Sequence, residues 1–172
     1  MDNIFLIGMP GCGKTTIAKE LAKILGYAFL DADEVIVKRA GKTIPELFAV
    51  SEEHFRDAEH EAMVYLSKKE KTIIACGGGV IKRRENMTAI QKTGKVFFIN
   101  RPLKDIIASV ETSTRPLLKD GKGKMYVLYE DRLPLYLKYS HHVVGETGSA
   151  REIAAEIIAI LHKQAKRKLK RK

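Results

Sequence analysis

The residues best suited to chemistry lie in the segment Gly8–Thr15, which reads G-M-P-G-C-G-K-T. It matches G-x-x-x-x-G-K-[ST], with a short apolar run before it and a helical pattern after it. Glycines let successive backbone N–H groups turn toward phosphate oxygens, and the N-terminus of the next helix adds its dipole. Lys14 supplies a positive charge for the β- and γ-phosphates, and the Thr15 hydroxyl can ligate Mg²⁺. The loop predicts a nucleoside triphosphate site but leaves the acceptor open.

Two carboxylates, Asp31 and Asp33, directly follow a predicted strand. The carboxyl ends of strands in an open α/β sheet border the crevice in which ligands bind. In an extended chain a spacing of two would place both carboxylates on the same side of the strand. One can then hold metal-bound water while the other accepts the proton of an attacking hydroxyl. Asp33 as the N-cap of the next helix is an equally open interpretation, and it does not exclude catalysis.

Three arginines and a run of glycines are the other candidates. Arg56 and Arg132 are expected on helices, and together they would suit a carboxylate substrate through bidentate pairing. Arg56 and Glu59 are also spaced as an ordinary surface ion pair, which is the alternative for that helix. The glycines 77–79 follow a buried strand and indicate either the close approach of a ligand or a tight strand exit. Arg115 falls in a loop, where it either neutralises a transferring phosphoryl group or is simply solvated.

Short apolar runs predict the strands that must position these groups. They are Ile4–Ile7, Ala28–Leu30, Thr72–Ala75, Val96–Ile99 and His142–Val144. Amphipathic stretches between them predict helices over residues 33–39, 44–49, 52–67, 82–91, 103–110, 124–139 and 149–163. Ser149 is a candidate N-cap of the last helix, because Glu152 follows three residues later. Strands that alternate with helices predict a parallel sheet covered on both faces.

Length and composition restrict the class of protein to which this chain can belong. The 172 residues, 45% of them hydrophobic, suit one domain with a buried core. No run of 18 apolar residues and no cleavable leader pattern is present, so neither a membrane span nor secretion is expected. Two cysteines exclude a disulfide scaffold, and a reducing, cytoplasmic setting is expected.

The net charge of +10 is concentrated at the C-terminus. Residues 163–172 contain seven Lys or Arg and no acid, which leaves +3 of the +10 for residues 1–162. The tail either contacts RNA or another acidic surface, or is a solvated helix end. We therefore expect one domain over residues 1–162, with a loop around 111–124 that forms a lid, and a basic C-terminal tail over 163–172.

Taken in order, these motifs resemble the shikimate kinase family across essentially residues 1–162. The matching segments are Gly8–Thr15, Phe29–Asp33, Ile44–Phe48, Phe55-Arg56-x-x-Glu59, Gly77–Gly79, Arg115–Leu118 and Arg132-x-Pro134-x-Tyr136. The resemblance implies an α/β P-loop NTPase fold, an adenylate-kinase-like three-layer sandwich with a five-stranded parallel sheet. It also implies transfer of the γ-phosphate of ATP to the 3-hydroxyl of shikimate, giving shikimate 3-phosphate and ADP, a step of chorismate and aromatic amino-acid biosynthesis.

The same resemblance implies roles on the acceptor side. Asp33 would bind the shikimate hydroxyls and serve as, or stand in for, the general base. Arg56 and Arg132 would hold the shikimate carboxylate. The backbone N–H of Gly78 would bind a ring hydroxyl.

On the nucleotide side, the resemblance implies that Lys14 and Arg115 contact the transferring phosphate. Thr15 would ligate Mg²⁺, and Asp31 would support the metal through water. The full set expected to bind ATP is Gly11, Cys12, Gly13, Lys14, Thr15, Thr16 and Arg115. Many family members carry an adenine-stacking arginine where this chain has Ala108, so a modest preference for ATP over GTP is expected.

Shikimate and ATP are the expected partners of a monomeric enzyme, with no membrane or nucleic-acid partner. One alternative is another small-metabolite P-loop kinase, acting on gluconate or a nucleotide. That alternative shares the phosphate loop but gives no reason for Asp33, Arg56, the glycine run and Arg132 together. The other alternative is a non-catalytic nucleotide- or RNA-binding module that uses the basic tail.

Overall fold

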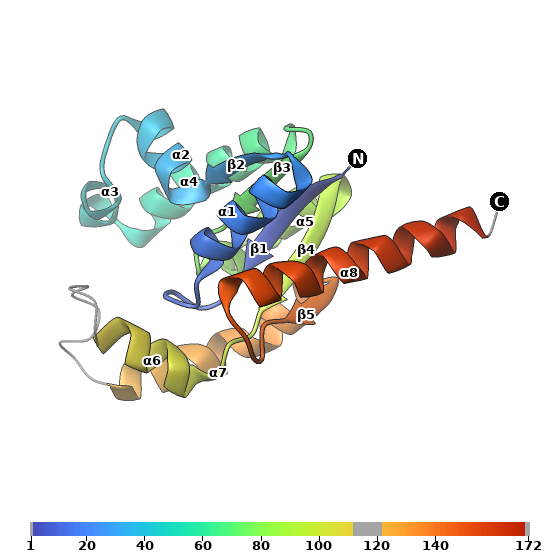
Figure 1. Cartoon of the computed structure of the whole chain (residues 1–172). Helices are drawn as coiled ribbons and strands as arrows, with labels where there is room; N and C mark the ends of the chain where they lie inside the picture. Colours follow the sequence, from blue (N-terminus) through green and yellow to red (C-terminus); the bar gives the residue numbers. More distant parts are fainter. Residues whose placement is uncertain (1, 112–121, 171–172) are drawn as a thin grey trace.

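The computed structural model of this chain describes residues 2–111 and 122–170 (Figure 1). Its five strands form one parallel sheet in the order β2-β3-β1-β4-β5. The strands are β1 (Asn3–Ile7), β2 (Ala28–Asp31), β3 (Thr72–Ala75), β4 (Gly94–Ile99) and β5 (His142–Val144). The predicted strands are confirmed, with extensions of one or two residues at β1, β2 and β4. The α/β class with a five-stranded parallel sheet is therefore confirmed as well.

Helices cover both faces of this sheet. They are α1 (Lys14–Leu25), α2 (Ala32–Ala40), α3 (Ile44–Val50), α4 (Glu52–Ser67), α5 (Arg84–Thr93), α6 (Leu103–Glu111), α7 (Lys122–Tyr139) and α8 (Ala150–Leu169). A short 3₁₀ turn, η1 (Val80–Lys82), precedes α5 and replaces the start predicted for that helix. α1 and α8 pack together on one face, whereas α4, α5 and α7 lie on the other (Figure 1).

The burial of the central strand β1 shows why helices must cover both faces of the sheet. All five of its residues are buried, so its side chains meet apolar neighbours above and below the sheet. Ile4 lies between Ile73 of β3 and Lys95 of β4 in the parallel register. Because the strands run in the same direction, their carboxyl ends share one edge, and the segments after β1, β2 and β3 meet there.

Capping explains two helix starts and corrects one prediction. Ser149 and Glu152 form the predicted capping box at the start of α8. The N-cap of α2 is Asp31, whose side chain accepts a hydrogen bond from the backbone N–H of Asp33 at 2.9 Å. Asp33 as the N-cap is therefore wrong, and so is the extended-chain argument that placed both aspartates on one side of a strand. The helix begins immediately after β2, so Asp33 lies in its first turn.

The C-terminal helix is longer than predicted. α8 continues past residue 163 to Leu169, so the basic segment is an exposed extension of the helix as far as it is described. In Figure 1 this end projects beyond the rest of the molecule. No helix in the described ranges is long and apolar enough to cross a bilayer. Arg115 and most of the predicted lid lie outside the described residues.

Candidate active site

The loop between β1 and α1 is shaped to receive phosphate. Gly8 has φ +150°, and a Cβ there would lie 2.8 Å from the carbonyl oxygen of Ile99, so a larger residue does not fit. The buried Lys14 side chain folds back over the loop and donates hydrogen bonds to the carbonyls of Gly8 and Met9, both at 2.9 Å. The Cys12 side chain is fully buried, so only its backbone can face a ligand.

Hard oxygen donors lie beside this loop. The Thr15 hydroxyl donates a hydrogen bond to Oδ2 of Asp31 at 3.0 Å, which brings the start of α1 next to the end of β2. Within the described ranges there is no cluster of three or more His, Cys, Asp or Glu side chains that would enclose a metal by itself. This donor set fits Mg²⁺, which usually keeps several waters and binds through one or two carboxylates together with substrate phosphates.

One cavity of about 640 Å³ joins the phosphate loop to most of the other predicted site residues. Its lining includes Gly11, Gly13, Lys14, Thr15, Thr16, Asp31, Asp33, Arg56, Gly78 and Arg132. Cys12 does not line it, because its side chain points into the core. The predicted convergence of two guanidinium groups and one aspartate in a shared cavity is thus present, contributed by α2, α4 and α7.

The glycine run after β3 makes this convergence possible. A Cβ on Gly79 would lie 2.5 to 2.8 Å from the guanidinium atoms of Arg56. At Gly78 it would lie 2.9 Å from Pro10 and 3.1 Å from Nη1 of Arg132, and at Gly77 it would lie 3.2 Å from Oδ1 of Asp33. The space that the glycines leave is therefore used by side chains of the site itself.

Arg56 and Glu59 form a buried ion pair, so the surface-pair alternative is wrong. Nη1 of Arg56 donates to Oε1 of Glu59 at 2.8 Å, and the Glu59 side chain is only 2% exposed. Burial raises the pKa of Glu59, while the Arg56 guanidinium opposes that shift. Glu59 thus fixes the orientation of the guanidinium that lines the cavity.

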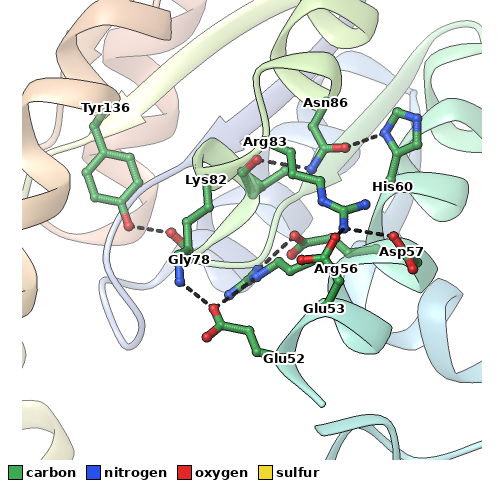
Figure 2. A network of polar contacts seen from close by, with 12 residues as sticks. Glu52, Glu53, Arg56, Asp57, His60, Gly78, Lys82, Arg83, Asn86 and Tyr136 are labelled. Atoms are coloured by element: carbon green, nitrogen blue, oxygen red, sulfur yellow. Dashed lines mark hydrogen bonds and ion pairs between the residues drawn. The ribbon is translucent and has the colours of Figure 1, made fainter. Parts of the chain in front are cut away.

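Three further residues shape the site without having been assigned a role from sequence. The buried Tyr136 hydroxyl donates to the carbonyl of Gly78 at 2.6 Å, which fixes the peptide beside Arg132 (Figure 2). Burial raises the pKa of Tyr136 to about 12, and the nearby Arg132 opposes this shift.

The ring centroids of Phe48 and Phe55 lie 4.3 Å apart, and the stacked rings form an apolar wall of the cavity. For Tyr136 the sequence did contain a signal, because its i, i+4 spacing from Arg132 places both side chains on one face of the same helix.

Substituting Gly79 by alanine tests whether Arg56 is as tightly placed as the contacts indicate. The backbone of Gly79, at φ −96°, accepts alanine, but the new Cβ must displace the guanidinium. We expect the KM for the acceptor to rise by about tenfold or more, because a displacement of about 1 Å at a bidentate site is costly. The KM for ATP serves as the internal control and should change little. Unchanged acceptor kinetics would show that Arg56 moves aside freely.

A second cavity, of about 610 Å³, lies between α1 and the start of α8. Its lining includes Thr16, Glu20, Lys23, Ser149 and Arg151. Thr16, in the first turn of α1, also lines the first cavity, so the two cavities are neighbours. Arg151 was left out of the site predicted from sequence, and the structure places it in the lining of this second cavity.

The fold and the joined cavity define a class, the small-molecule kinases with a P-loop. A family model, "Shikimate kinase", matches residues 10–162. Shikimate kinase of Clostridium botulinum (strain Alaska E43 / Type E3) is 42% identical over 160 residues, covering 93% of this chain and 97% of its own. That of Nostoc punctiforme is 42% identical over 164 residues, covering 92% and 90%.

Solved structures agree with this family match. Shikimate kinase from Acinetobacter baumannii in complex with shikimate has a TM-score of 0.88 at 30% identity, covering 95% of this chain and 94% of its own. The structure from Aquifex aeolicus has a TM-score of 0.82 at 33% identity, covering 95% and 98%. The chain belongs to the shikimate kinase family, whose members transfer a phosphoryl group to shikimate.

Proposed function

We propose that this protein transfers the γ-phosphoryl group of ATP to the 3-hydroxyl of shikimate, releasing shikimate 3-phosphate and ADP. The observation that supports this most directly is that Lys14, Thr15, Arg56 and Arg132 all line one cavity. A phosphate-binding loop alone would serve any nucleotide. Two arginines in the same cavity call for an anionic acceptor, such as a small carboxylic acid.

On the acceptor side, Arg56 and Arg132 hold the shikimate carboxylate and so fix the direction in which the ring enters. Asp33 then binds ring hydroxyls and takes the proton of the attacking 3-hydroxyl. The Gly78 N–H binds another ring hydroxyl, and Tyr136 keeps that peptide in place through the Gly78 carbonyl. The buried pairing of Arg56 with Glu59 means that the guanidinium is oriented before the acceptor arrives.

On the nucleotide side, the backbone N–H groups of Gly11, Cys12 and Gly13 face the phosphates. Lys14 leaves the loop carbonyls that it contacts here and stabilises the charge on the β- and γ-phosphates. We assign Arg115 the same task. Mg²⁺, held by Thr15 and supported by Asp31 through water, would neutralise phosphate charge in the bound complex.

The magnesium assignment predicts that Asp31→Asn raises the Mg²⁺ concentration needed for half-maximal activity by about tenfold. The carboxylate is lost, but asparagine is an equally good N-cap and keeps the hydrogen bond to the backbone of Asp33. A Mg²⁺ titration at saturating ATP and shikimate measures the effect, with the melting temperature as the control for folding. An unchanged Mg²⁺ requirement would remove Asp31 from the metal site.

A coupled ADP-release assay with shikimate, gluconate and nucleoside monophosphates as separate acceptors tests the proposed activity. We expect turnover with shikimate and background rates with the others. Deleting residues 163–172 should barely alter that turnover. If the chain instead bound nucleic acid in a strongly salt-dependent way through its tail and released no ADP, the binding-module alternative would replace ours.

We place the nucleoside end of ATP in the second cavity, because this cavity adjoins the first one at Thr16, next to the phosphate loop. We also propose that residues 1–162 form one catalytic domain and that the protein is a monomer. The cytoplasm is its proposed compartment, since both cysteines are free thiols and ATP is consumed there.

A further inference from the structure

Arg56 is approached by two carboxylates rather than one. Besides Glu59, Oε1 of Glu52 lies 3.5 Å from Nε of Arg56, one helical turn earlier on α4. The Arg56 side chain is only 10% exposed, whereas that of Glu52 is 53% exposed. Two carboxylates beside one guanidinium give a local charge of −1, which opposes binding of a third carboxylate.

A lysine from another element contacts the second carboxylate. Lys82, the last residue of η1, donates a hydrogen bond to the same Oε1 of Glu52 that lies near Arg56 (Figure 2). Nε of Arg56 is buried and has no hydrogen-bond partner among the described residues. The shared oxygen is therefore hydrogen-bonded to Lys82, and it forms only a longer ion pair with Nε of Arg56, at 3.5 Å. The pKa of Glu52 is lowered mainly by its hydrogen bond to Lys82, which agrees with this arrangement.

We propose that Lys82 is a positioning residue for the acceptor site: it binds the Glu52 carboxylate directly, keeps it from a hydrogen bond with Arg56, and thereby leaves the guanidinium to the acceptor's carboxylate. This inference rests on the proposed function, because it assumes that the acceptor is a carboxylic acid. Lys82 and Glu52 do not themselves line the cavity, so neither contacts the acceptor. Their effect passes through the charge and orientation of Arg56.

A neighbouring ion pair provides a matched control. Arg83, the residue directly after η1, binds Glu53 and Asp57, which are also on α4, so it links the chain beside Lys82 to the same helix (Figure 2). Neither of these acidic residues forms an ion pair with Arg56 in the described structure. A purely structural link between η1 and α4 would make substitutions of Lys82 and Arg83 equivalent. A specific action on Arg56 would make them different.

The experiment compares Lys82→Met with Arg83→Met in the full chain, using steady-state kinetics in the ADP-release assay. We expect Lys82→Met to raise the KM for shikimate by about threefold to fivefold, the range for a half-exposed ion pair. Its kcat and its KM for ATP should stay within about twofold of the parent, because neither the reacting atoms nor the phosphate loop changes. Arg83→Met should leave the KM for shikimate unchanged.

The double variant Glu52→Gln/Lys82→Met completes the test. Once the competing carboxylate is neutral, the KM for shikimate should return to within about twofold of the parent value. An unchanged KM in Lys82→Met, an equal rise in Arg83→Met, or no recovery in the double variant would each overturn the inference while leaving the proposed function intact. If the parent protein did not turn over shikimate at all, the proposed function and this inference would fall together.

Discussion

Replacing Asp33 by asparagine is expected to lower kcat by about 10²-fold to 10⁴-fold, the usual contribution of a positioned general base. Asparagine has nearly the same shape and still forms hydrogen bonds, but it cannot take the proton of the attacking hydroxyl. Asp33 lies in the first turn of α2 against Gly77, inside the cavity that also contains Arg132. Initial rates at saturating shikimate and ATP measure the loss directly.

Glu34→Gln is the matched control for this variant. Glu34 is the next residue in the same helical turn and carries the same charge, but it does not line the cavity. Its kcat should stay within about twofold of the parent, and the KM for ATP of Asp33→Asn should do the same. If Asp33→Asn kept more than about a tenth of the parent kcat, Asp33 would be an acceptor-binding residue only.

Replacing Arg132 by methionine is expected to lower kcat/KM for shikimate by about 100-fold, mainly through a higher KM. Methionine fills a similar volume along the side-chain stem but leaves the acceptor's carboxylate without one of its two cations. Arg132 is half-buried on α7, with Nη1 close to Gly78, so its head group lies beside the glycine run. Saturation curves for shikimate at fixed ATP give the two constants separately.

Two further variants sharpen this prediction. Arg132→Lys keeps the charge but not the planar fork, and it should recover only part of the loss, to about tenfold below the parent. Lys138→Met removes an exposed cation from the same helix, outside the cavity, and should change neither constant. A raised KM for ATP with normal shikimate kinetics in Arg132→Met would instead assign this arginine to the phosphates.

Local signals in the sequence were enough for most of the fold. Apolar runs marked all five strands, and Ser149 with Glu152 marked the start of α8, because such patterns depend only on neighbours along the chain. The phosphate loop could also be predicted from neighbouring residues alone. The geometry of Asp31 and Asp33 could not, since the prediction assumed that the strand continued through both residues. The chain instead turns into α2 at Ala32 and makes Asp31 the cap.

The acceptor side depended on contacts that no local pattern reveals. Arg56 and Glu59 have the same spacing whether their helix face is exposed or buried, and burial is decided by Gly79 and the strand before it. Lys82 and Glu52 are 30 residues apart, and their pairing appears only when η1 packs beside α4. The resemblance to a family could name Arg132 as a partner of Arg56, but only the fold brings the two into one cavity.

The strand order has a consequence for how such enzymes diversify. Apart from Arg132, the residues proposed to bind the acceptor come from one uninterrupted stretch between the end of β2 and η1, whereas the phosphate loop follows β1. Mutations in that stretch can remodel the acceptor pocket while the ATP machinery stays intact. The residues proposed for the acceptor and those proposed for ATP therefore lie, apart from Arg132, in separate parts of the chain.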